Sequence, residues 1–576
     1  MIWSWPLISG IVIATITPTL LYKALQFGRN VQHARRSGLP YTFSPIHELE
    51  LWAFLTNAVL RWMYAGYLMQ EKGWPRWARF MIKDWMYEDR GRAHVEYGEV
   101  FLVVSPGGVV CYIASADVAM GVCARRKVFV KPPEKMKMLE PFGPNVVSTD
   151  GDIWRAHIRV TLPSFGEGVH RLVWSETMRQ SQMLTSAWLA HDSRELKTDI
   201  YNLTCNVMSC VAFGQPAEWT AEANAKSQNH RLSLVQAIMG VVNNLGAILL
   251  LPPWLLQWTR ESVYTAYSEF EQYMNELLNK EQKRMTSHPD SEGGVAKGNL
   301  LTAVLKSNAE APAGDNEPLP SRSKAGFHLT DEEVKGNVFI FLLAGYDTTA
   351  NTILYSSIVL VLYPDIQNQI IEEVHRVYVE AARAGRSELT YEDDLPKFRY
   401  LLAFMYEVMR VFPIVIPITR MAATEQPLAV SGSQHPLASD TMIIINNTAI
   451  HHSDSHWVKP HIIEPRRWLT NHPNEYDPEA PTPDQEDEIR LGTASIPCHK
   501  RGTFMTFNEG PRSCLGRRFA MIEFVAFFSR LLKQGRLGLK GDMTPSEVER
   551  QVRLRAGGSP VTLIPPCDVK VCLSVE

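Results

Sequence analysis

The stretch FNEGPRSCLGRRFA, Phe507–Ala520, encloses a single cysteine, Cys514, between two glycines and among three arginines. Gly510 and Gly516 permit positive φ and a close backbone approach, so peptide N–H groups can point at the sulfur and lower its basicity. The next residues, RRFAMIEFVAFFSRLL, predict an amphipathic helix whose N-terminal dipole also favours a thiolate. These residues alone leave two interpretations open: an inert buried thiol, or a thiolate that binds the iron of a haem.

A second pattern lies in the apolar stretch from Asn337 to Tyr363. It follows TDEE, Thr330–Glu333, a capping box in which a hydroxyl and a carboxylate satisfy the first free amides of a helix. The stretch is long enough to span a membrane, but a carboxylate at its middle, Asp347, would cost roughly 2.5 to 3.5 kcal/mol there. We therefore expect a buried helix that crosses the whole domain and ends near Tyr363.

The middle of this predicted helix reads AGYDTT, Ala344–Thr349. Gly345 weakens the helix, and the Thr348 hydroxyl can bond back to the preceding turn, so a local opening can admit O2 and water. Asp347 supplies an acid for relaying protons, and Thr348 supplies a hydroxyl. A capped break between two helices is the alternative interpretation.

Together with two further segments, these patterns are similar to those of the cytochrome P450 monooxygenases. The cysteine loop has the spacing F-x-x-G-x-R-x-C-x-G and resembles the family's haem-binding signature, and AGYDTT resembles its oxygen-handling helix. Glu407 and Arg410, in LLAFMYEVMRVFP, resemble the E-x-x-R of its buried charged triad, which Arg467 in EPRRW completes. The resemblance implies haem b as the cofactor, with Cys514 as the axial ligand of the iron.

The resemblance also implies roles for individual residues. Asp347 and Thr348 would be the catalytic proton relay, and Arg512 would grip a haem propionate. The segment GDIWRAHIRVTLPSF resembles the helix that binds the propionates, but Ile158 stands where an arginine is usual, and we expect Arg420 to supply the missing cation. The cofactor-binding residues implied in this way are Trp154, His157, Arg420, Phe507, Gly510, Arg512 and Gly516.

Long helical stretches dominate the 576 residues and no clear linker divides them. We therefore expect one mainly α domain with a minor β-sheet, in the cytochrome P450 fold. VFLVVSPGGVVCYIA, Val100–Ala114, predicts a β-hairpin, and residues 285–324 predict a loop region with one short helix at NLLTAVL. A net charge of −3 with mixed signs offers no basic face for nucleic acid. Three histidines, His451, His452 and His456, are interpreted as part of a solvated loop rather than as a metal cluster.

The N-terminus predicts membrane attachment. Residues 1–22 carry no charged side chain and match a hydrocarbon core of roughly 30 Å. Lys23, Arg29, Arg35 and Arg36 follow, which places the body in the cytoplasm. We expect a transmembrane signal anchor at 1–22, a basic and Pro/Gly hinge at 23–50 and the catalytic domain at 51–576, held as a single-pass protein in the endoplasmic reticulum membrane. GAILLLPPWLLQW, residues 246–258, is either a buried helix end or a loop that dips into the bilayer surface.

The predicted function is a monooxygenase that uses O2 to oxidise an apolar small molecule. No G-x-G-x-x-G follows a strand and opens a helix, so electrons must come from a separate NADPH-cytochrome P450 reductase, with cytochrome b5 as a further candidate partner. The expected docking residues are Lys500, Arg501, Arg517 and Arg518. The expected pocket residues are Phe339, Leu343, Ala344, Ile414–Ile418 and the loop Lys131–Val147. The sequence as a whole is similar to those of fungal family members that oxidise terpenoid or polyketide products.

Two rival functions remain. A haem-thiolate isomerase or dehydratase would need neither external O2 nor a reductase, and the presence of both Asp347 and Thr348 argues against it because such chemistry needs no proton relay. The other rival is a non-enzymatic, membrane-tethered helical protein with a structural thiol.

Overall fold

The computed structural model describes residues 5–48, 50–68, 73–190, 194–219, 229–287, 299–310, 328–480, 485, 499–557, 562–566 and 569–574. Most of these residues are helical. The helices are α1 (Trp5–Ser37), α2 (Leu51–Leu68), α3 (Arg76–Arg79), α4 (Trp85–Asp89), α5 (Arg92–Tyr97), α6 (Ala116–Ala124), α7 (Pro133–Met136), α8 (Gly151–Thr161), α9 (Glu167–Leu189), α10 (Leu196–Phe213), α11 (Leu234–Asn243), α12 (Leu245–Leu250), α13 (Pro253–Thr259), α14 (Glu261–Ser287), α15 (Leu300–Ala309), α16 (Asp331–Leu362), α17 (Pro364–Arg383), α18 (Tyr391–Asp394), α19 (Arg399–Val411), α20 (Asn447–His451), α22 (Arg517–Gln534) and α23 (Pro545–Leu554).

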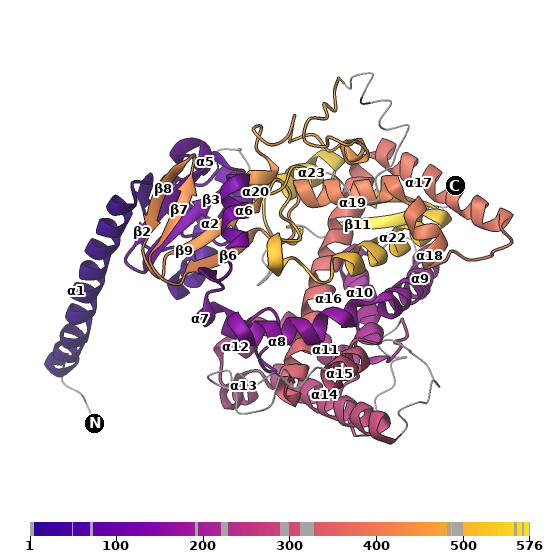
Figure 1. Cartoon of the computed structure of the whole chain (residues 1–576), viewed down its shortest axis with the longest axis horizontal. Helices are drawn as coiled ribbons and strands as arrows, with labels where there is room; N and C mark the ends of the chain where they lie inside the picture. The colour runs from indigo at the N-terminus through magenta and orange to yellow at the C-terminus, as the bar shows by residue number, and fades with distance from the viewer. Residues whose placement is uncertain are drawn as a thin grey trace.

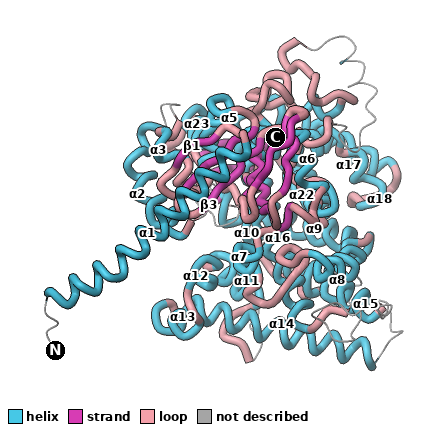
Figure 2. Tube along the Cα trace, turned by 60° about the vertical axis from the view of Figure 1, so that its left-hand side comes forward, coloured by secondary structure: helices cyan, strands magenta, loops and turns pink. Residues whose placement is uncertain are grey.

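The strands form small sheets. They are β1 (Tyr41–Phe43), β2 (Val100–Ser105), β3 (Gly108–Ile113), β4 (Phe129–Val130), β5 (Arg194–Glu195), β6 (Pro417–Ala422), β7 (Gln426–Val430), β8 (Ser433–Leu437), β9 (Met442–Asn446), β10 (Arg536–Lys540) and β11 (Lys570–Ser574). A six-stranded sheet has the order β1-β2-β3-β9-β6-β4, and two further sheets have the orders β10-β11-β5 and β7-β8. The six-stranded sheet lies beside α1, apart from the main body of helices, whereas β11 lies on the opposite side of the molecule (Figure 1). Figure 2, turned by 60° from this view, shows that helices make up most of the described chain. The predicted mainly α fold with a minor sheet is confirmed.

The predicted hairpin is also confirmed, since β2 and β3 pair antiparallel from Val100 opposite Ile113 to Ser105 opposite Gly108. The short helix predicted at NLLTAVL is α15. The rest of the predicted loop region, at 288–298 and 311–324, lies outside the described residues.

Residues 1–4 of the predicted anchor lie outside the described part of the chain, as do the side chains of residues 5–17. From Trp5 the chain forms α1, whose first half projects away from the body (Figure 1). The basic residues Lys23 to Arg36 lie on this same helix, and Ala34 packs against the six-stranded sheet. The helix ends at Ser37, and Gly38 follows with a φ of +69°.

Helix α16 runs through the middle of the helical part. Thr330 and Glu333 form the predicted capping box: each side chain bonds the other residue's backbone N–H. Among the described residues α16 is the one helix long and apolar enough to cross a membrane, but 83% of its apolar window is buried inside the protein. It is therefore a core helix, as its central Asp347 predicted. It is continuous through Gly345, so the alternative of a break between two helices is wrong.

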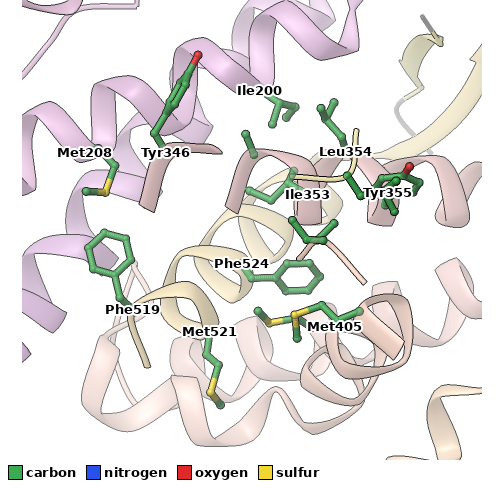
Figure 3. Close-up of a cluster of buried hydrophobic side chains, with 14 of the residues drawn as sticks. Ile200, Met208, Tyr346, Ile353, Leu354, Tyr355, Met405, Phe519, Met521 and Phe524 are labelled. Carbon is green, nitrogen blue, oxygen red and sulfur yellow. The ribbon is translucent and has the colours of Figure 1, made fainter. Parts of the chain in front are cut away.

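Side chains of α10, α19 and α22 pack around α16. Figure 3 shows Ile353 and Leu354 of α16 among Ile200 of α10, Phe524 of α22 and Met405 of α19. All five side chains are buried with at most 2% of their surface exposed. Apolar burial of this kind is the main favourable term in folding, so this core fixes α22, and with it the cysteine loop, relative to α16.

The charged triad ties α19 to the segment before the cysteine loop. Glu407 accepts hydrogen bonds from Arg410 (2.8 and 2.9 Å), Arg467 (3.1 Å) and the Trp468 indole (2.8 Å). Glu407, Arg410 and Arg467 are fully buried. Burial alone would raise the pKa of Glu407, but the charges of Arg410 and Arg467 lower it to about 2. The predicted triad is confirmed.

We predict that Glu407→Gln strongly destabilises the protein. The substitution leaves two buried arginines without their counter-charge, which costs about 3–5 kcal/mol. Because the carboxylate's pKa falls from 4.5 to about 2 on folding, the wild type keeps this contribution above pH 4.5 and loses it only as the pH falls through about 2. Urea unfolding measures the effect.

The matched control is Glu372→Gln, which removes an exposed carboxylate from α17. It should leave the unfolding midpoint unchanged. Equal midpoints for Glu407→Gln and Glu372→Gln would contradict the structural role of the triad.

Candidate active site

A cavity of about 980 Å³ of empty space lies between α16 and the cysteine loop, part of it open to solvent. Its lining residues are Lys131, Val146, Val147, Trp154, Ile158, Phe165, Met208, Leu300, Ile340, Phe341, Ala344, Gly345, Thr348, Thr349, Phe507, Pro511, Arg512, Ser513, Cys514, Leu515, Gly516, Phe519 and Ala520. Most of these side chains are apolar. Two of them, Met208 of α10 and Phe519 of α22, approach each other from neighbouring helices (Figure 3).

The cysteine loop is held by its own backbone. The Cys514 N–H donates to the Phe507 carbonyl at 2.8 Å, and the Asn508 side chain donates to the Arg512 carbonyl at 3.0 Å. Gly510 has a φ of +72°, and a Cβ there would lie 3.2 Å from the Cys123 carbonyl oxygen. A side chain at position 510 would therefore be both strained and crowded.

Gly516 does not use the positive φ that a glycine permits. Its φ is −84°. Gly516 is the N-cap of α22, and this position points its N–H at the Cys514 sulfur. A Cβ at position 516 would lie 3.9 Å from that sulfur, at ordinary contact distance.

The Cys514 sulfur is accessible although protein surrounds it, because its free surface faces the cavity. Burial raises the pKa of the thiol, while the Gly516 N–H and the charge and N–H of Arg517 act in the opposite direction. A bound metal ion deprotonates a coordinating thiol outright. The site therefore suits a thiol that loses its proton and becomes a thiolate when its sulfur binds a metal ion.

Arg512 and Trp154 form one edge of the cavity. The Arg512 guanidinium lies 4.2 Å from the Trp154 ring centre, and Arg126 lies 4.5 Å from the same centre. Arg512 also donates to Asp150 at 2.7 Å and to the Val146 and Thr149 carbonyls. Arg512 and Trp154, both predicted to bind the cofactor, thus lie in contact in the lining of the cavity.

Lys131 adds a cation that the sequence did not single out for cofactor binding. It lines the cavity, and its ammonium donates to the Val147 carbonyl at 2.7 Å. Burial, Arg512 and Arg420 lower the pKa of Lys131 to about 7. Ile158, at the position where the family's arginine is usual, also lines the cavity. Lys131 can thus supply the positive charge that is missing at position 158. The two residues come together at the cavity only in the folded chain.

The charge of Arg420 on β6 acts on Lys131 and Arg512, but Arg420 does not belong to the described lining of the cavity. It is 4% exposed, its Nη1 donates to the Thr419 carbonyl at 2.8 Å, and its buried Nη2 has no hydrogen-bond partner in the described part of the chain. The positive charge of four side chains is thus greater than the negative charge of the nearby Asp150 carboxylate. These side chains are Arg126, Lys131, Arg420 and Arg512. Buried cations without partners are costly, so this edge of the cavity favours an anionic ligand.

His157, a predicted cofactor residue, has its side-chain partners on α16. It is fully buried, and its Nδ1 lies 2.8 Å from the Asn337 amide and its Nε2 3.4 Å from Glu333, both on α16. Within the described chain it is not among the residues that line the cavity. It connects α8 to α16 instead.

The two predicted relay residues lie on different faces of α16. Thr348 lines the cavity, and its hydroxyl donates to the Ala344 carbonyl at 2.6 Å, as its position predicted. Asp347 is buried and does not line the cavity; its carboxylate accepts from Thr562 at 2.6 Å and from Tyr201 at 3.2 Å. A Cβ on Gly345 would lie 2.6 Å from the Met208 sulfur, so this glycine also permits close helix packing.

Some of the residues predicted to line the pocket line the cavity, and others do not. Ala344 and the loop residues Lys131, Val146 and Val147 line the cavity. Phe339 and Leu343 are buried in the core and, with Ile414–Ile418, do not belong to its described lining.

The histidine segment is not the solvated loop that we expected. His451 is fully buried and accepts a hydrogen bond from the Met505 N–H at 2.9 Å, and His452 lies 2.9 Å from Arg90. His451 therefore supports the segment that leads into the cysteine loop. Among the described residues there is no group of three or more His, Cys, Asp or Glu side chains placed to hold a metal ion.

The four residues expected to face an electron donor differ in exposure. Lys500, Arg501 and Arg518 are exposed. Arg517 is half-buried, because its guanidinium donates to the Tyr406 hydroxyl at 2.9 Å and lies over the Phe507 ring.

The chain belongs to the cytochrome P450 family, since the family's sequence profile matches residues 74–560. A cytochrome P450 monooxygenase of Penicillium rubens, prx9, is 37% identical over 580 residues, covering 98% of this chain and 97% of the relative. A cytochrome P450 monooxygenase of Arthrobotrys oligospora is 27% identical, covering 92% and 90%. A solved zebrafish cytochrome P450 has the same fold, with a TM-score of 0.61 and 19% identity, covering 85% of this chain and 99% of that structure. The protein is thus a cytochrome P450 monooxygenase, an oxidoreductase.

Members of this family hold a haem through a cysteine thiolate, and the cavity fits that group. An apolar space with an accessible sulfur suits the macrocycle. The cations Arg512 and Lys131 in the lining suit its two carboxylates. They would hold those carboxylates, with Trp154 beside them and the charge of Arg420 acting on both cations.

We predict that Lys131→Met weakens haem retention. A charge-assisted hydrogen bond is worth about 1.5–3 kcal/mol, so the haem should leave roughly ten times faster or more. Transfer of haem to excess apomyoglobin measures this rate.

Lys131→Arg keeps the charge and should retain the haem nearly as well as the wild type. Lys127→Met removes an exposed lysine nearby and should have no effect. If Lys131→Met released haem no faster than Lys127→Met, the assignment of Lys131 would be wrong.

Proposed function

We propose that Cys514 supplies the thiolate that binds the haem iron, and that the enzyme inserts one atom of O2 into an apolar small molecule. The observation that carries this proposal is the arrangement of the cavity: the Cys514 sulfur and the Thr348 side chain both face it, from separate elements, across mostly apolar walls. When bound, a thiolate-ligated haem supplies the activation of O2.

The residues of the chain have distinct tasks in this reaction. Gly516 and Arg517 direct N–H groups at the sulfur and moderate its donation to the iron. Thr348 presents a hydroxyl inside the cavity, and Asp347, one residue earlier in α16, holds a carboxyl group outside it. Burial raises the pKa of Asp347, so this group can bind and release a proton near neutral pH more readily than an exposed aspartate.

The substrate is an apolar molecule. The side chains of Ile158, Phe165, Leu300, Ile340 and Phe341 line the cavity without ionisable groups. A relative from Leptosphaeria maculans, 25% identical and covering 92% of this chain, is named for a phomenoic acid biosynthesis cluster. This relative's place in a biosynthesis cluster supports a secondary metabolite as the substrate, and we propose a terpenoid or polyketide.

Electrons come from an NADPH-cytochrome P450 reductase, with cytochrome b5 as a second donor. The exposed cations Lys500, Arg501 and Arg518, near the cysteine loop in the sequence, support a docking site for an acidic partner there.

The protein is held in the endoplasmic reticulum membrane by its N-terminal segment, with the catalytic domain in the cytoplasm. The uncharged residues 1–22 and the cations that follow support this placement. The exposed apolar side chains of Leu250, Trp254 and Trp258, on α12 and α13, support a second contact with the bilayer surface.

Isotope labelling tests the reaction. Terpenoid and polyketide compounds that shift the Soret band on binding are incubated with the enzyme, purified reductase, NADPH and 18O2. We expect one labelled oxygen atom per product and one NADPH consumed. Conversion of a hydroperoxide without reductase or NADPH would instead indicate the isomerase or dehydratase chemistry.

We predict that Thr348→Val leaves haem content normal but diverts reducing equivalents to hydrogen peroxide. The variant removes the hydroxyl that faces the cavity, so product formed per NADPH should fall by roughly tenfold or more. Peroxide release and NADPH oxidation are measured together.

Thr352→Val provides a matched control on the same helix. The Thr352 hydroxyl also donates to the carbonyl four residues earlier, at 2.8 Å, but its side chain does not belong to the described lining of the cavity. The role of Thr348 would be contradicted if Thr348→Val formed as much product per NADPH as the wild type. It would also be contradicted if both variants released equal amounts of hydrogen peroxide per NADPH.

A further inference from the structure

A closed hydrogen-bond network surrounds Asp347 on the side of α16 away from the cavity lining. Thr562 donates to Oδ2 of Asp347 at 2.6 Å, and the Tyr201 hydroxyl lies 3.2 Å from Oδ1. The same Tyr201 hydroxyl lies 3.0 Å from the side-chain oxygen of Asn351, and the Asn351 amide donates to Thr562 at 3.0 Å. Three separate parts of the chain, α10, α16 and the C-terminal segment, thus meet at one carboxyl group.

Counting hydrogens shows that Tyr201 has a choice of partner. Its hydroxyl carries one hydrogen, yet both neighbouring oxygens, of Asp347 and of Asn351, are acceptors when Asp347 is ionised. Tyr201 then donates to Asp347. When Asp347 is protonated, it can donate to the Tyr201 oxygen, and Tyr201 can turn its hydrogen to Asn351. The network therefore accepts both protonation states of Asp347 with one rotation of a hydroxyl.

Tyr201 performs this change without losing its own proton. Burial and the nearby charge of Asp347 raise the pKa of Tyr201 well above its ordinary value. Its side chain on α10 is half-buried, whereas Asp347 and Asn351 are buried. Among the described residues, the other ionisable groups that act with Asp347 are Tyr346, on the same helix, and Lys83, before α4.

We propose that Tyr201 is a positioning residue for the proton relay: its hydroxyl alternates between Asp347 and Asn351 and thereby sets when Asp347 takes up and releases a proton. Thr562 holds the second oxygen of the carboxyl group in both states. This inference rests on the relay role of Asp347 in the proposed function.

The direction of its effect follows from the charges. Burial raises the pKa of Asp347, and the hydrogen bonds from Thr562, Tyr201 and Asn351 each lower it. Removal of the Tyr201 hydroxyl takes away one interaction that favours the carboxylate. The pKa of Asp347 should then rise further, whether the activity increases or decreases when this group loses its proton.

The experiment compares Tyr201→Phe with Tyr346→Phe in the haem-loaded protein. The two rings contact each other with centroids 5.2 Å apart, but the buried Tyr346 hydroxyl has no hydrogen-bond partner in the described part of the chain. Infrared spectra are recorded across pH, and the carboxylic acid C=O band of Asp347 is identified by its loss in Asp347→Asn.

We expect the midpoint of that band to move to higher pH by about half a unit or more in Tyr201→Phe and to stay in place in Tyr346→Phe. The pH dependence of peroxide released per NADPH, measured with reductase, should shift by the same amount. An unchanged midpoint in Tyr201→Phe, an equal shift in Tyr346→Phe, or no band that depends on Asp347 would overturn the proposal. A wild type that fails to oxidise NADPH would contradict the proposed function, whereas the infrared midpoint would still decide the role of Tyr201.

Discussion

The structure depends on keeping a space open at the centre of a hydrophobic core, with a sulfur atom exposed to it. Protein interiors normally close around such a space, because empty volume forfeits contacts on every side. Here α16 and the cysteine loop bound a cavity that neither can fill, since α22 is packed against α16 and the loop is fixed by its own backbone bonds. The positions of α16 and the loop therefore determine the shape of the cavity and the exposure of the sulfur.

Polar groups are divided between the two sides of α16. On the cavity side, Lys131 and Arg512 line the space, and their positive charge, with the nearby carboxylate of Asp150, suits a ligand with two carboxylates. On the other side, Asp347 accepts hydrogen bonds from hydroxyl and amide groups, and the charge of Lys83 also acts on it. The first set favours the binding of an anion, and the second favours a carboxyl group that can change its protonation state. The two groups of polar side chains meet α16 at consecutive residues, Thr348 on the cavity side and Asp347 on the other.

Much of this organisation could be predicted from local sequence. The capping box at Thr330 and the hairpin at Val100–Ala114 depend on residues close together in the sequence, and the structure confirms both. The buried triad was predicted from the resemblance of its E-x-x-R and EPRRW segments to those of the cytochrome P450 family, since an ion pair at i and i+3 is by itself usually a weak surface pair.

The parts that sequence reasoning missed depend on partners far apart in the chain. Lys131 meets Arg512 and Arg420 only after folding, and Tyr201 meets Asp347 across 146 residues. The buried partners of His157 on α16 and of His451 in the segment before the cysteine loop were missed for the same reason. The sequence permits positive φ at Gly516 but could not specify its conformation, because a glycine is free to adopt several.

The central claim is that Cys514 is the ligand of the haem iron, and the spectrum of the reduced protein with carbon monoxide tests it most directly. A thiolate-ligated haem gives a red-shifted Soret band under these conditions. We predict this band in the wild type and in Cys123→Ala, which removes a buried thiol beside the loop, and its loss in Cys514→Ala. A red-shifted band that persists in Cys514→Ala would contradict the assignment.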